Sequence, residues 1–152
     1  MRVFLDTEFD GFGGKLISLA LVAEDGHEFY GVHSIPASPH PWVAEHVLPV
    51  LPIDGHSGLP KTEEEFMQDF SLFIWRYPGC EVVADWPADF SHFCDLLTFR
   101  GEADGFRIPL ECTMRLLRGG PEISPEIPHN ALSDARALRD WHRDWGKYHE
   151  NR

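Results

Sequence analysis

The stretch VFLDTEF at residues 3–9 decides the fold, because it joins an apolar run to a pair of acids. Its first three residues are typical of a strand buried in a sheet. Residues two apart in a strand point to the same face, so Asp6 and Glu8 project together while Thr7 points away. Two neighbouring carboxylates repel each other and require a cation or a shared proton. The pair therefore indicates either a hard divalent metal held by carboxylates or a solvated acidic turn leading into the glycines at 11–14.

The composition indicates one domain over residues 1–152. Hydrophobic residues make up 43% of the chain and aromatic residues 12%, which is enough for a packed core and excludes wholesale disorder. The longest apolar run, at 19–23, is too short to span a membrane, and we expect no signal peptide before the first strand. Three cysteines without a C-x-x-C spacing predict reduced thiols. We therefore expect a cytoplasmic protein.

The net charge of −12 argues against a protein that grips long nucleic acid by its backbone, since such binding needs a basic surface. A site that holds a few terminal nucleotides through bound cations is compatible with this charge, because the cations reverse the local field.

The first half of the chain predicts a three-stranded antiparallel meander. An apolar strand at 16–23 and a return strand at 28–33 flank Asp25-Gly26, which is a hairpin turn signal. Half of the 12 prolines fall in 36–60, so we expect an irregular segment there with one short helix at 42–48. We interpret this segment as a variable loop rather than a place for chemistry.

Helices and strands alternate in the second half. Thr62 and Glu65 form a capping box before a helix whose apolar face continues to Tyr77 and which Gly79 ends. A buried strand follows at 81–86, parallel to the first strand. The next helix presents an apolar face made by Phe90, Phe93, Cys94 and Leu97.

The C-terminal third predicts a strand at 107–112, placed at a sheet edge because Pro109 cannot donate to a ladder. Thr113 is expected to cap a helical turn at 114–118, and Asn130 to cap a final helix from Ala131 onward. The fold class is therefore α/β, a mixed sheet of one antiparallel meander plus parallel strands, with helices packed on it.

Three further acids and a histidine stand at the ends of these elements. Asp85 and Asp89 follow the strand at 81–86, and Asp134 lies in the first turns of the last helix, five residues after His129. Each has a structural explanation on its own: a helix cap for Asp89, a helix-dipole partner for Asp134 and a loop residue for His129. Together with the acidic pair of the first strand they form a pattern.

That pattern consists of DTEF at 6–9, ADWPADF at 84–90 and HNALSDA at 129–135. In order and spacing these motifs resemble the DEDDh 3′-5′ exonucleases of the RNase T and proofreading-subunit superfamily, over nearly the whole chain. In its small size and in the residues of the first two motifs, the chain looks most like the small mycobacterial-type exoribonucleases. The resemblance implies an RNase H-like fold whose three motifs converge at one end of the sheet.

Carried over residue by residue, the resemblance implies that Asp6, Glu8, Asp89 and Asp134 hold two Mg²⁺ or Mn²⁺ ions. His129 would be the general base that takes a proton from the attacking water. Two cations roughly 3.5–4 Å apart stabilise charge on both the attacking and the leaving oxygen, and oxygen ligands select hard metals over zinc. A histidine with a pKa of about 6.5 accepts a proton at physiological pH. The loop position of His129 suggests that it swings in when substrate binds.

The match departs from the family in the second motif, where Ala88 stands in place of the aromatic that commonly precedes the acid. Asp85, four residues before Asp89, competes for the metal role. We assign the metal to Asp89 because its position at the start of a helix matches the family arrangement. Asp85 is expected to act as a supporting group that orients a ligand.

Substrate contacts are less clearly indicated. Phe9 and Phe12 flank the acidic pair and could stack on the terminal base; Phe12 is expected to be exposed and Phe9 to pack in the core. From the resemblance, backbone amides near Thr7 are expected to meet the terminal sugar. Three arginines are candidate phosphate contacts, unless they belong to solvated helix faces: Arg115, Arg118 and Arg136.

We therefore predict a metal-dependent 3′-5′ exoribonuclease that removes nucleoside monophosphates from single-stranded 3′ ends. The preference for RNA rests on the resemblance alone. The alternatives are a proofreading-type DNA exonuclease, a hydrolase of very short oligonucleotides, and a non-catalytic nucleic-acid-binding module. A homodimer is a further expectation from the resemblance, with Trp42, Trp141 and Trp145 as large apolar groups for its interface or for the core.

Overall fold

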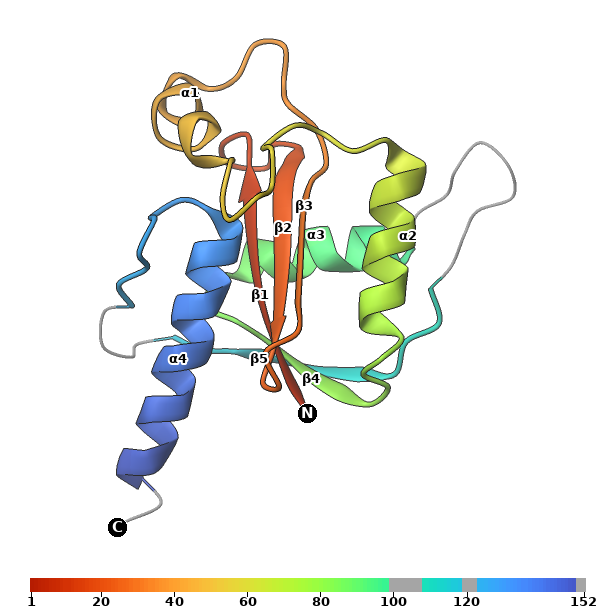
Figure 1. Ribbon diagram of the computed structural model, residues 1–152, viewed down its shortest axis with the longest axis vertical. Coiled ribbons are helices and arrows are strands. Elements are labelled where there is room, and N and C mark those ends of the chain that lie inside the picture. The colour runs from red at the N-terminus through yellow and green to blue at the C-terminus, as the bar shows by residue number, and fades with distance from the viewer. Residues whose placement is uncertain (99–107, 119–122, 150–152) are drawn as a thin grey trace.

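The structure is a computed structural model that describes residues 1–98, 108–118 and 123–149. Its centre is a five-stranded mixed sheet in the order β3-β2-β1-β4-β5 (Figure 1). The meander is antiparallel, whereas β4 runs parallel to β1 and β5 runs parallel to β4. The strands are β1 (Arg2–Phe9), β2 (Leu16–Ala23), β3 (Glu28–Val32), β4 (Cys80–Ala84) and β5 (Cys112–Leu116). The predicted α/β class, the meander and the parallel strands are confirmed.

Four α-helices and one 3₁₀ turn accompany the sheet in the described residues. They are α1 (Pro41–His46), the 3₁₀ turn η1 (Leu48–Val50), α2 (Glu63–Ile74), α3 (Pro87–Leu97) and α4 (Ala131–His149). The short helix expected at 42–48 is therefore present, two residues shorter at its C-terminal end. Within the described ranges, no helix combines the length and the apolar character that crossing a membrane requires.

The two faces of the sheet are covered by different helices, because residues of β1 alternate between them. Val3 and Leu5 pack against apolar residues of α2 and α3, which include Phe70 and Phe93. Phe4 points to the other face and packs against Leu138 of α4. Full burial of each such side chain contributes about 1.5–3 kcal/mol. The same alternation directs Asp6 and Glu8 to the α4 face and Thr7 to the α3 face.

Two predicted helix caps are present in the structure. The Thr62 hydroxyl accepts a 3.2 Å hydrogen bond from the Glu65 amide, and the Glu65 carboxylate accepts one of 3.0 Å from the Thr62 amide. At α4, Asn130 Oδ1 accepts from the amides of Leu132 and Ser133, at 3.0 and 3.1 Å. The helix after Thr62 ends earlier than expected, since α2 stops at Ile74 and Tyr77 lies buried in the following turn.

The prediction for residues 107–118 was wrong in its detail. The strand is Cys112–Leu116, so the segment expected to form a helical turn is β5, and Pro109 lies before it. β5 pairs in parallel with β4, from Cys80↔Cys112 to Ala84↔Leu116. A single isolated turn of helix is marginal in water, so the ladder along β4 prevails over the local cap signal of Thr113. The expected edge position is correct, and Arg107 lies outside the described residues.

Candidate active site

β1 delivers two acids to the α4 side of the sheet. Asp6 pairs with Ala20 and Glu8 with Ser18 on β2, and the register shifts directly after Glu8. Bulges of this kind are common beside active sites, where they redirect the chain. Carboxylate oxygens of Asp6, Glu8 and Asp134 all lie within 4.8 Å of one another. The structure thus brings together the predicted acids of the first and last motifs.

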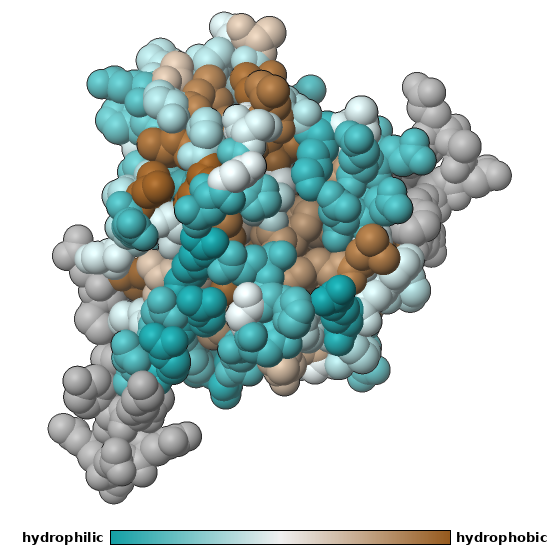
Figure 2. Space-filling model, in the orientation of Figure 1, coloured by the Kyte–Doolittle hydropathy of each residue, from teal (hydrophilic) through white to brown (hydrophobic). Residues whose placement is uncertain are grey.

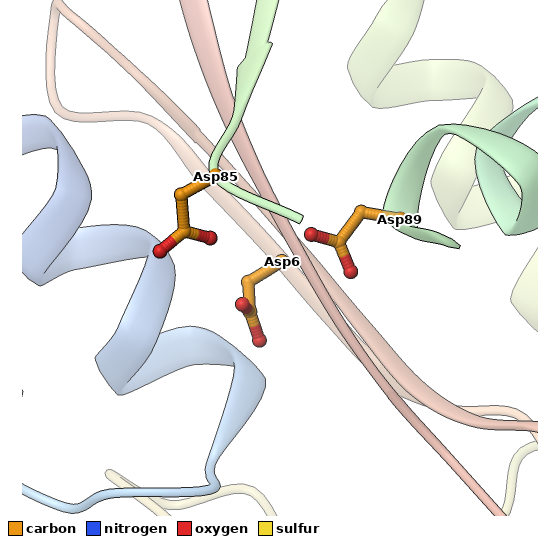
Figure 3. A group of neighbouring side chains, drawn as sticks. All are labelled: Asp6, Asp85 and Asp89. Atoms are coloured by element: carbon orange, nitrogen blue, oxygen red, sulfur yellow. The ribbon is translucent and has the colours of Figure 1, made fainter. Parts of the chain in front are cut away.

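A second group of acids shares Asp6 with the first. Carboxylate oxygens of Asp6, Asp85 and Asp89 also lie within 4.8 Å of one another. Figure 3 shows their origins: Asp6 comes from β1, Asp85 from the segment after β4, and Asp89 from the start of α3. The N-cap of α3 is Trp86, and Asp89 is the third helical residue, so Asp89 is not the helix cap.

Asp89 reaches this group from the opposite face of the sheet and is oriented by Thr7. The Thr7 hydroxyl donates a 2.7 Å hydrogen bond to Asp89 Oδ1. Among the described residues, no donor reaches the buried oxygens Asp6 Oδ2 and Asp89 Oδ2. Buried polar atoms are normally satisfied, so these two oxygens fit a bound cation. All the candidate metal ligands in the two groups are carboxylate oxygens, which are the ligands that Mg²⁺ and Mn²⁺ prefer.

The pKa values of these carboxyl groups are raised in the absence of a metal, chiefly because burial disfavours their charged forms. Burial, and then the neighbouring Asp89 and Glu8, raise the pKa of Asp6 well above its usual range. Burial and the nearby acids raise the pKa of Glu8 to about 8. Burial also raises the pKa values of Asp89 and Asp134, each to about 7. A cluster that resists ionisation in this way is stabilised by positive charge.

The pKa of Asp85 is also raised by burial, although the charge of Arg118 opposes the shift. Its carboxylate lies in one acid group with the predicted ligands Asp6 and Asp89. The sequence placed Asp85 outside the metal site as an orienting residue. The geometry makes it a candidate ligand as well.

His129 stands between the acids and the start of α4. Its amide donates a 3.1 Å hydrogen bond to Asp134 Oδ2. Its φ of 65° lies in the left-handed region, which costs a non-glycine residue roughly 1–3 kcal/mol and is common at functional sites. Burial, and then the neighbouring His46, lower the pKa of the imidazole. The lowered pKa favours the neutral imidazole, which can accept a proton.

These residues line one cavity of about 440 Å³. Asp6, Asp85, Asp134 and His129 form its polar wall, and residues of the segment 123–128 close it on the other side. A cavity of this volume accommodates a small ligand of nucleotide size. In this cavity three acids and a histidine face a common volume.

Sequence reasoning missed a contact of His129 with the segment interpreted as a variable loop. The Trp42 ring of α1 lies 4.8 Å from the His129 ring, centroid to centroid, with the ring planes at 81°. His46, one helical turn after Trp42, stacks on Trp42 at 4.7 Å. The spacing of four residues on one short helix was visible in the sequence, but the contact with His129 was not.

The predicted substrate contacts lie in varied surroundings. Phe12 is 99% exposed, as expected, whereas Phe9 is only partly buried and meets the ring of His92 at 5.0 Å. Phe9 therefore does not lie in the hydrophobic core. Thr7 uses its side chain to hold Asp89.

The candidate phosphate-binding arginines are mostly engaged by acids. Arg136 forms ion pairs with Glu28 and Asp54. Its side chain is partly exposed on α4, whose outer surface appears as a hydrophilic band in Figure 2. The charge of Arg118 acts on Asp85: the Arg118 guanidinium lies 5.0 Å from the Trp86 ring and donates to the Asp85 carbonyl oxygen at 3.5 Å.

No family model matches this chain. Part of it is similar to two curated proteins of Mycobacterium tuberculosis, from strains CDC 1551 / Oshkosh and ATCC 25618 / H37Rv, each named a 3′-5′ exoribonuclease. Each is 40% identical to this chain over 90 residues, which are 57% of this chain and 52% of the relative. The chain therefore spans about half the length of the curated relatives it matches.

Proposed function

We propose that this chain is a metal-dependent 3′-5′ exoribonuclease that releases nucleoside monophosphates from single-stranded 3′ ends. The observation that carries the proposal is the two groups of acids that share Asp6, with the buried oxygens Asp6 Oδ2 and Asp89 Oδ2 lacking donors among the described residues, in one cavity with the His129 ring. The similarity to proteins named 3′-5′ exoribonucleases supports RNA as the polymer and the 3′ end as the point of attack.

Two cations fit the two acid groups. Asp6 and Glu8 with Asp134 would hold one cation, and Asp6 with Asp89 the other, with Asp85 within reach of the second group. When bound, such ions lower the pKa of water and neutralise charge on the attacking and leaving oxygens. Each of the four predicted ligands is a carboxylate whose pKa is raised without a cation, which supports this assignment.

The proposed reaction uses His129 as general base. Its ring accepts a proton from the water that attacks the terminal phosphodiester, and a bond forms between the water oxygen and phosphorus. The bond between phosphorus and O3′ of the preceding nucleotide breaks, and O3′ takes up a proton from solvent, so that a nucleoside 5′-monophosphate and a new 3′-hydroxyl result. His129 then returns its proton to solvent. The Asp134 carboxylate accepts a hydrogen bond from the His129 backbone amide and so holds the base beside the acids.

The sheet topology also supports this proposal. A three-stranded antiparallel meander followed by two parallel strands, with helices on both faces, is compatible with the RNase H-like fold of DEDDh exonucleases. In both, the end of the first strand, the start of a helix after a parallel strand, and the start of the last helix meet at the site.

A side-by-side assay tests the proposal. RNA and DNA 20-mers of one sequence, each labelled at the 3′ end, are incubated with the protein and Mn²⁺ or with a chelator. We expect release of labelled mononucleotide from RNA at a higher rate than from DNA, and none with the chelator or with Asp6→Ala. Asp95→Asn is the matched control, because Asp95 is an exposed acid on α3 outside both acid groups. A higher rate on DNA would instead favour a DNA exonuclease.

The net charge of −12 favours one second candidate, a hydrolase of very short oligonucleotides, since an acidic surface repels a long phosphate backbone. A length series from dinucleotide to 20-mer distinguishes the two functions. Specificity constants that fall steeply beyond a few nucleotides support the short-substrate enzyme. A different result would indicate a non-catalytic nucleic-acid-binding module. In that case neither polymer is cleaved with Mn²⁺, and Asp6→Ala raises thermal stability without changing nucleic-acid binding.

A further inference from the structure

We infer that Trp42 is a positioning residue that fixes the orientation of the His129 ring, an inference that rests on the proposed role of His129 as general base. The two rings are 4.8 Å apart between centroids and nearly perpendicular, at 81°. This edge-to-face arrangement is a favoured geometry for aromatic pairs. Trp42 belongs to α1, in the segment that the sequence predicts to be a variable loop.

The His129 ring needs such a support. The residue lies just before α4 with a φ of 65°, so it is outside the regular hydrogen bonding of the helix. Its amide is held by Asp134, but no hydrogen bond to the ring itself occurs in the part of the chain that the structure describes. General bases are usually oriented by a hydrogen bond to the second ring nitrogen. Here an aromatic contact takes that place.

Trp42 is itself held in place from within α1. His46 stacks on the Trp42 ring with centroids 4.7 Å apart and planes within 12°. His46 Nδ1 also lies 3.0 Å from the Trp42 carbonyl oxygen, which fixes the imidazole against the helix. The two parallel rings thus form a small block, and His129 stands nearly perpendicular to both.

The helix that carries this block is tied to the acid-bearing strand. The amide of His40, which precedes α1, donates a 2.7 Å hydrogen bond to Asp10 Oδ1 in the turn after β1. His40 Nδ1 in turn accepts a hydrogen bond of 3.3 Å from the Trp42 amide. The position of Trp42 is therefore coupled to the strand that carries Asp6.

The same segment is tied to the start of α4. Asn130, the neighbour of His129, donates from Nδ2 to the carbonyl oxygen of Val50 at 2.7 Å. Val43 and Val47 are buried in one core cluster with Ala131 and Leu132 of α4. The Trp42–His46 block and His129 therefore lie in segments that pack against each other. This packing fixes the Trp42 ring in its position beside the His129 ring.

Kinetics separate this role from direct contact with RNA, which the 44% exposure of Trp42 would also allow. We expect Trp42→Ala to lower kcat by about 10–100-fold with KM within about twofold of wild type, since a misplacement of about 1 Å can cost 100-fold. Trp42→Phe should restore most of kcat, because it keeps an aromatic ring. Trp75→Ala is the matched control, a tryptophan of similar exposure at the end of α2, and its kcat should stay unchanged. A rise in KM with kcat unchanged would overturn the inference and place Trp42 on the substrate.

A double-mutant cycle tests whether Trp42 acts through His129. On a His129→Asn background, Trp42→Ala should change the residual kcat by less than about twofold, because the group that it positions is gone. A further loss as large as in the wild-type background would overturn the inference.

A readout without catalysis keeps the inference separate from the proposed function. Resonances of the His129 ring, assigned by their loss in His129→Asn, should shift in Trp42→Ala when the ring current of tryptophan is removed, and should remain near their wild-type positions in Trp75→Ala. If wild type cleaves no nucleic acid but this shift occurs, the proposed function fails while the contact between Trp42 and His129 stands. If the His129 resonances do not move, the positioning fails whatever the activity.

Discussion

The Thr7 hydroxyl donates a 2.7 Å hydrogen bond to Asp89 Oδ1 and so connects the central strand to the first turn of α3. Thr7 stands between Asp6 and Glu8 in the sequence but faces the opposite side of β1. One short stretch of strand therefore supplies two acids on one side and orients a third from the other. The bond occupies one oxygen of Asp89 and leaves the second directed into the acid group, without a donor among the described residues.

Thr7→Val tests this relationship, because valine has nearly the same shape and no hydroxyl. It leaves Asp89 Oδ1 buried without its donor, which costs about 1–3 kcal/mol of the free energy of unfolding. At about 2–4 °C per kcal/mol for a chain of this size, we expect the Tm of the metal-free protein to fall by several degrees. Loss of an orienting hydrogen bond should also weaken Mn²⁺ binding by about 10–100-fold, measured by calorimetry.

Two further variants make that result specific. Thr7→Ser keeps the hydroxyl and should retain most of the Mn²⁺ affinity. Thr98→Val removes an exposed threonine hydroxyl at the other end of α3, which within the described ranges donates to the Cys94 and Asp95 carbonyl oxygens, and should leave Mn²⁺ affinity unchanged. Equal Mn²⁺ affinity in wild type and Thr7→Val would show that the hydrogen bond does not orient a metal ligand.

Asp6→Asn is expected to separate stability from metal binding. Asp6 lies in both acid groups, and its pKa is raised well above its usual range by burial and by its neighbours. Asparagine removes the charge that these surroundings disfavour, so the Tm of the metal-free protein should rise by about 2–5 °C. Wild type should gain roughly 5–10 °C from Mn²⁺ at about 100 times its Kd, whereas Asp6→Asn should gain almost nothing. A large Mn²⁺-dependent gain in Asp6→Asn would count against Asp6 as a ligand.

The stability of the metal-free protein should fall as pH rises toward 8. In the folded state the pKa values of Asp89 and Asp134 are about 7 and that of Glu8 is about 8, whereas unfolded carboxyl groups titrate near 4. The folded protein therefore binds more protons than the unfolded chain across this interval, and the free energy of unfolding decreases with pH. Added Mn²⁺ should abolish the decrease, because ionised carboxylates bind the metal.

Histidine titration also changes the stability of the folded protein, so the pH range of the measurement must lie above it. Several have lowered pKa values in the folded state, so their contribution rises with pH and is complete above about 6.5. They are His33, His56, His92, His129 and His142. Thermal scans between pH 6.5 and 8.5, with and without Mn²⁺, should therefore isolate the carboxyl groups. If the Tm of the metal-free protein stayed flat or rose with pH over this window, the acid cluster would not lower stability as predicted.

The parts of the fold that the sequence predicted correctly are those with local signals. Alternation in 3–9 places Asp6 and Glu8 on one face because the period of a strand is two residues. Thr62 and Asn130 cap helices through hydrogen bonds to residues two or three positions on, so their roles are visible in short stretches. These same local rules placed the acids of all three motifs at the ends of elements.

The errors and omissions concern contacts between distant segments. Thr113 carries a local cap signal, but pairing with β4 decides the structure of its segment. Trp42 and His129 meet only after α1 packs beside α4, and nothing near Trp42 in the sequence indicates that contact. The position of Asp85 beside Asp6 likewise depends on how the end of β4 lies against β1.

His129→Asn should abolish most activity without unfolding the protein. Asparagine tolerates the left-handed backbone conformation that His129 adopts, so the Tm should change little. Loss of a general base lowers kcat by about 10²–10⁴-fold. The acid limb of the kcat/KM profile should lie below about pH 6.5 in wild type, since burial lowers the pKa of His129, and it should vanish in the variant. His27→Asn, an exposed histidine in the β2–β3 turn, is the control, and a wild-type pH profile in His129→Asn would remove His129 from the mechanism.

Asp85 and Asp89 lie in the same acid group, and paired substitutions decide which of them holds metal. Asp89 is oriented by Thr7 and directs a buried oxygen without a donor among the described residues into the group, whereas the Asp85 carboxyl, whose pKa is raised by burial, already has the positive charge of Arg118 nearby. We therefore expect Asp89→Asn to lower kcat by at least about 100-fold and to weaken Mn²⁺ binding. Asp85→Asn should lower activity by about 10-fold or less, as is usual for a residue that orients a ligand rather than binding the metal. If Asp85→Asn instead caused the larger loss of kcat and of Mn²⁺ affinity measured by calorimetry, Asp85 and not Asp89 would be the metal ligand.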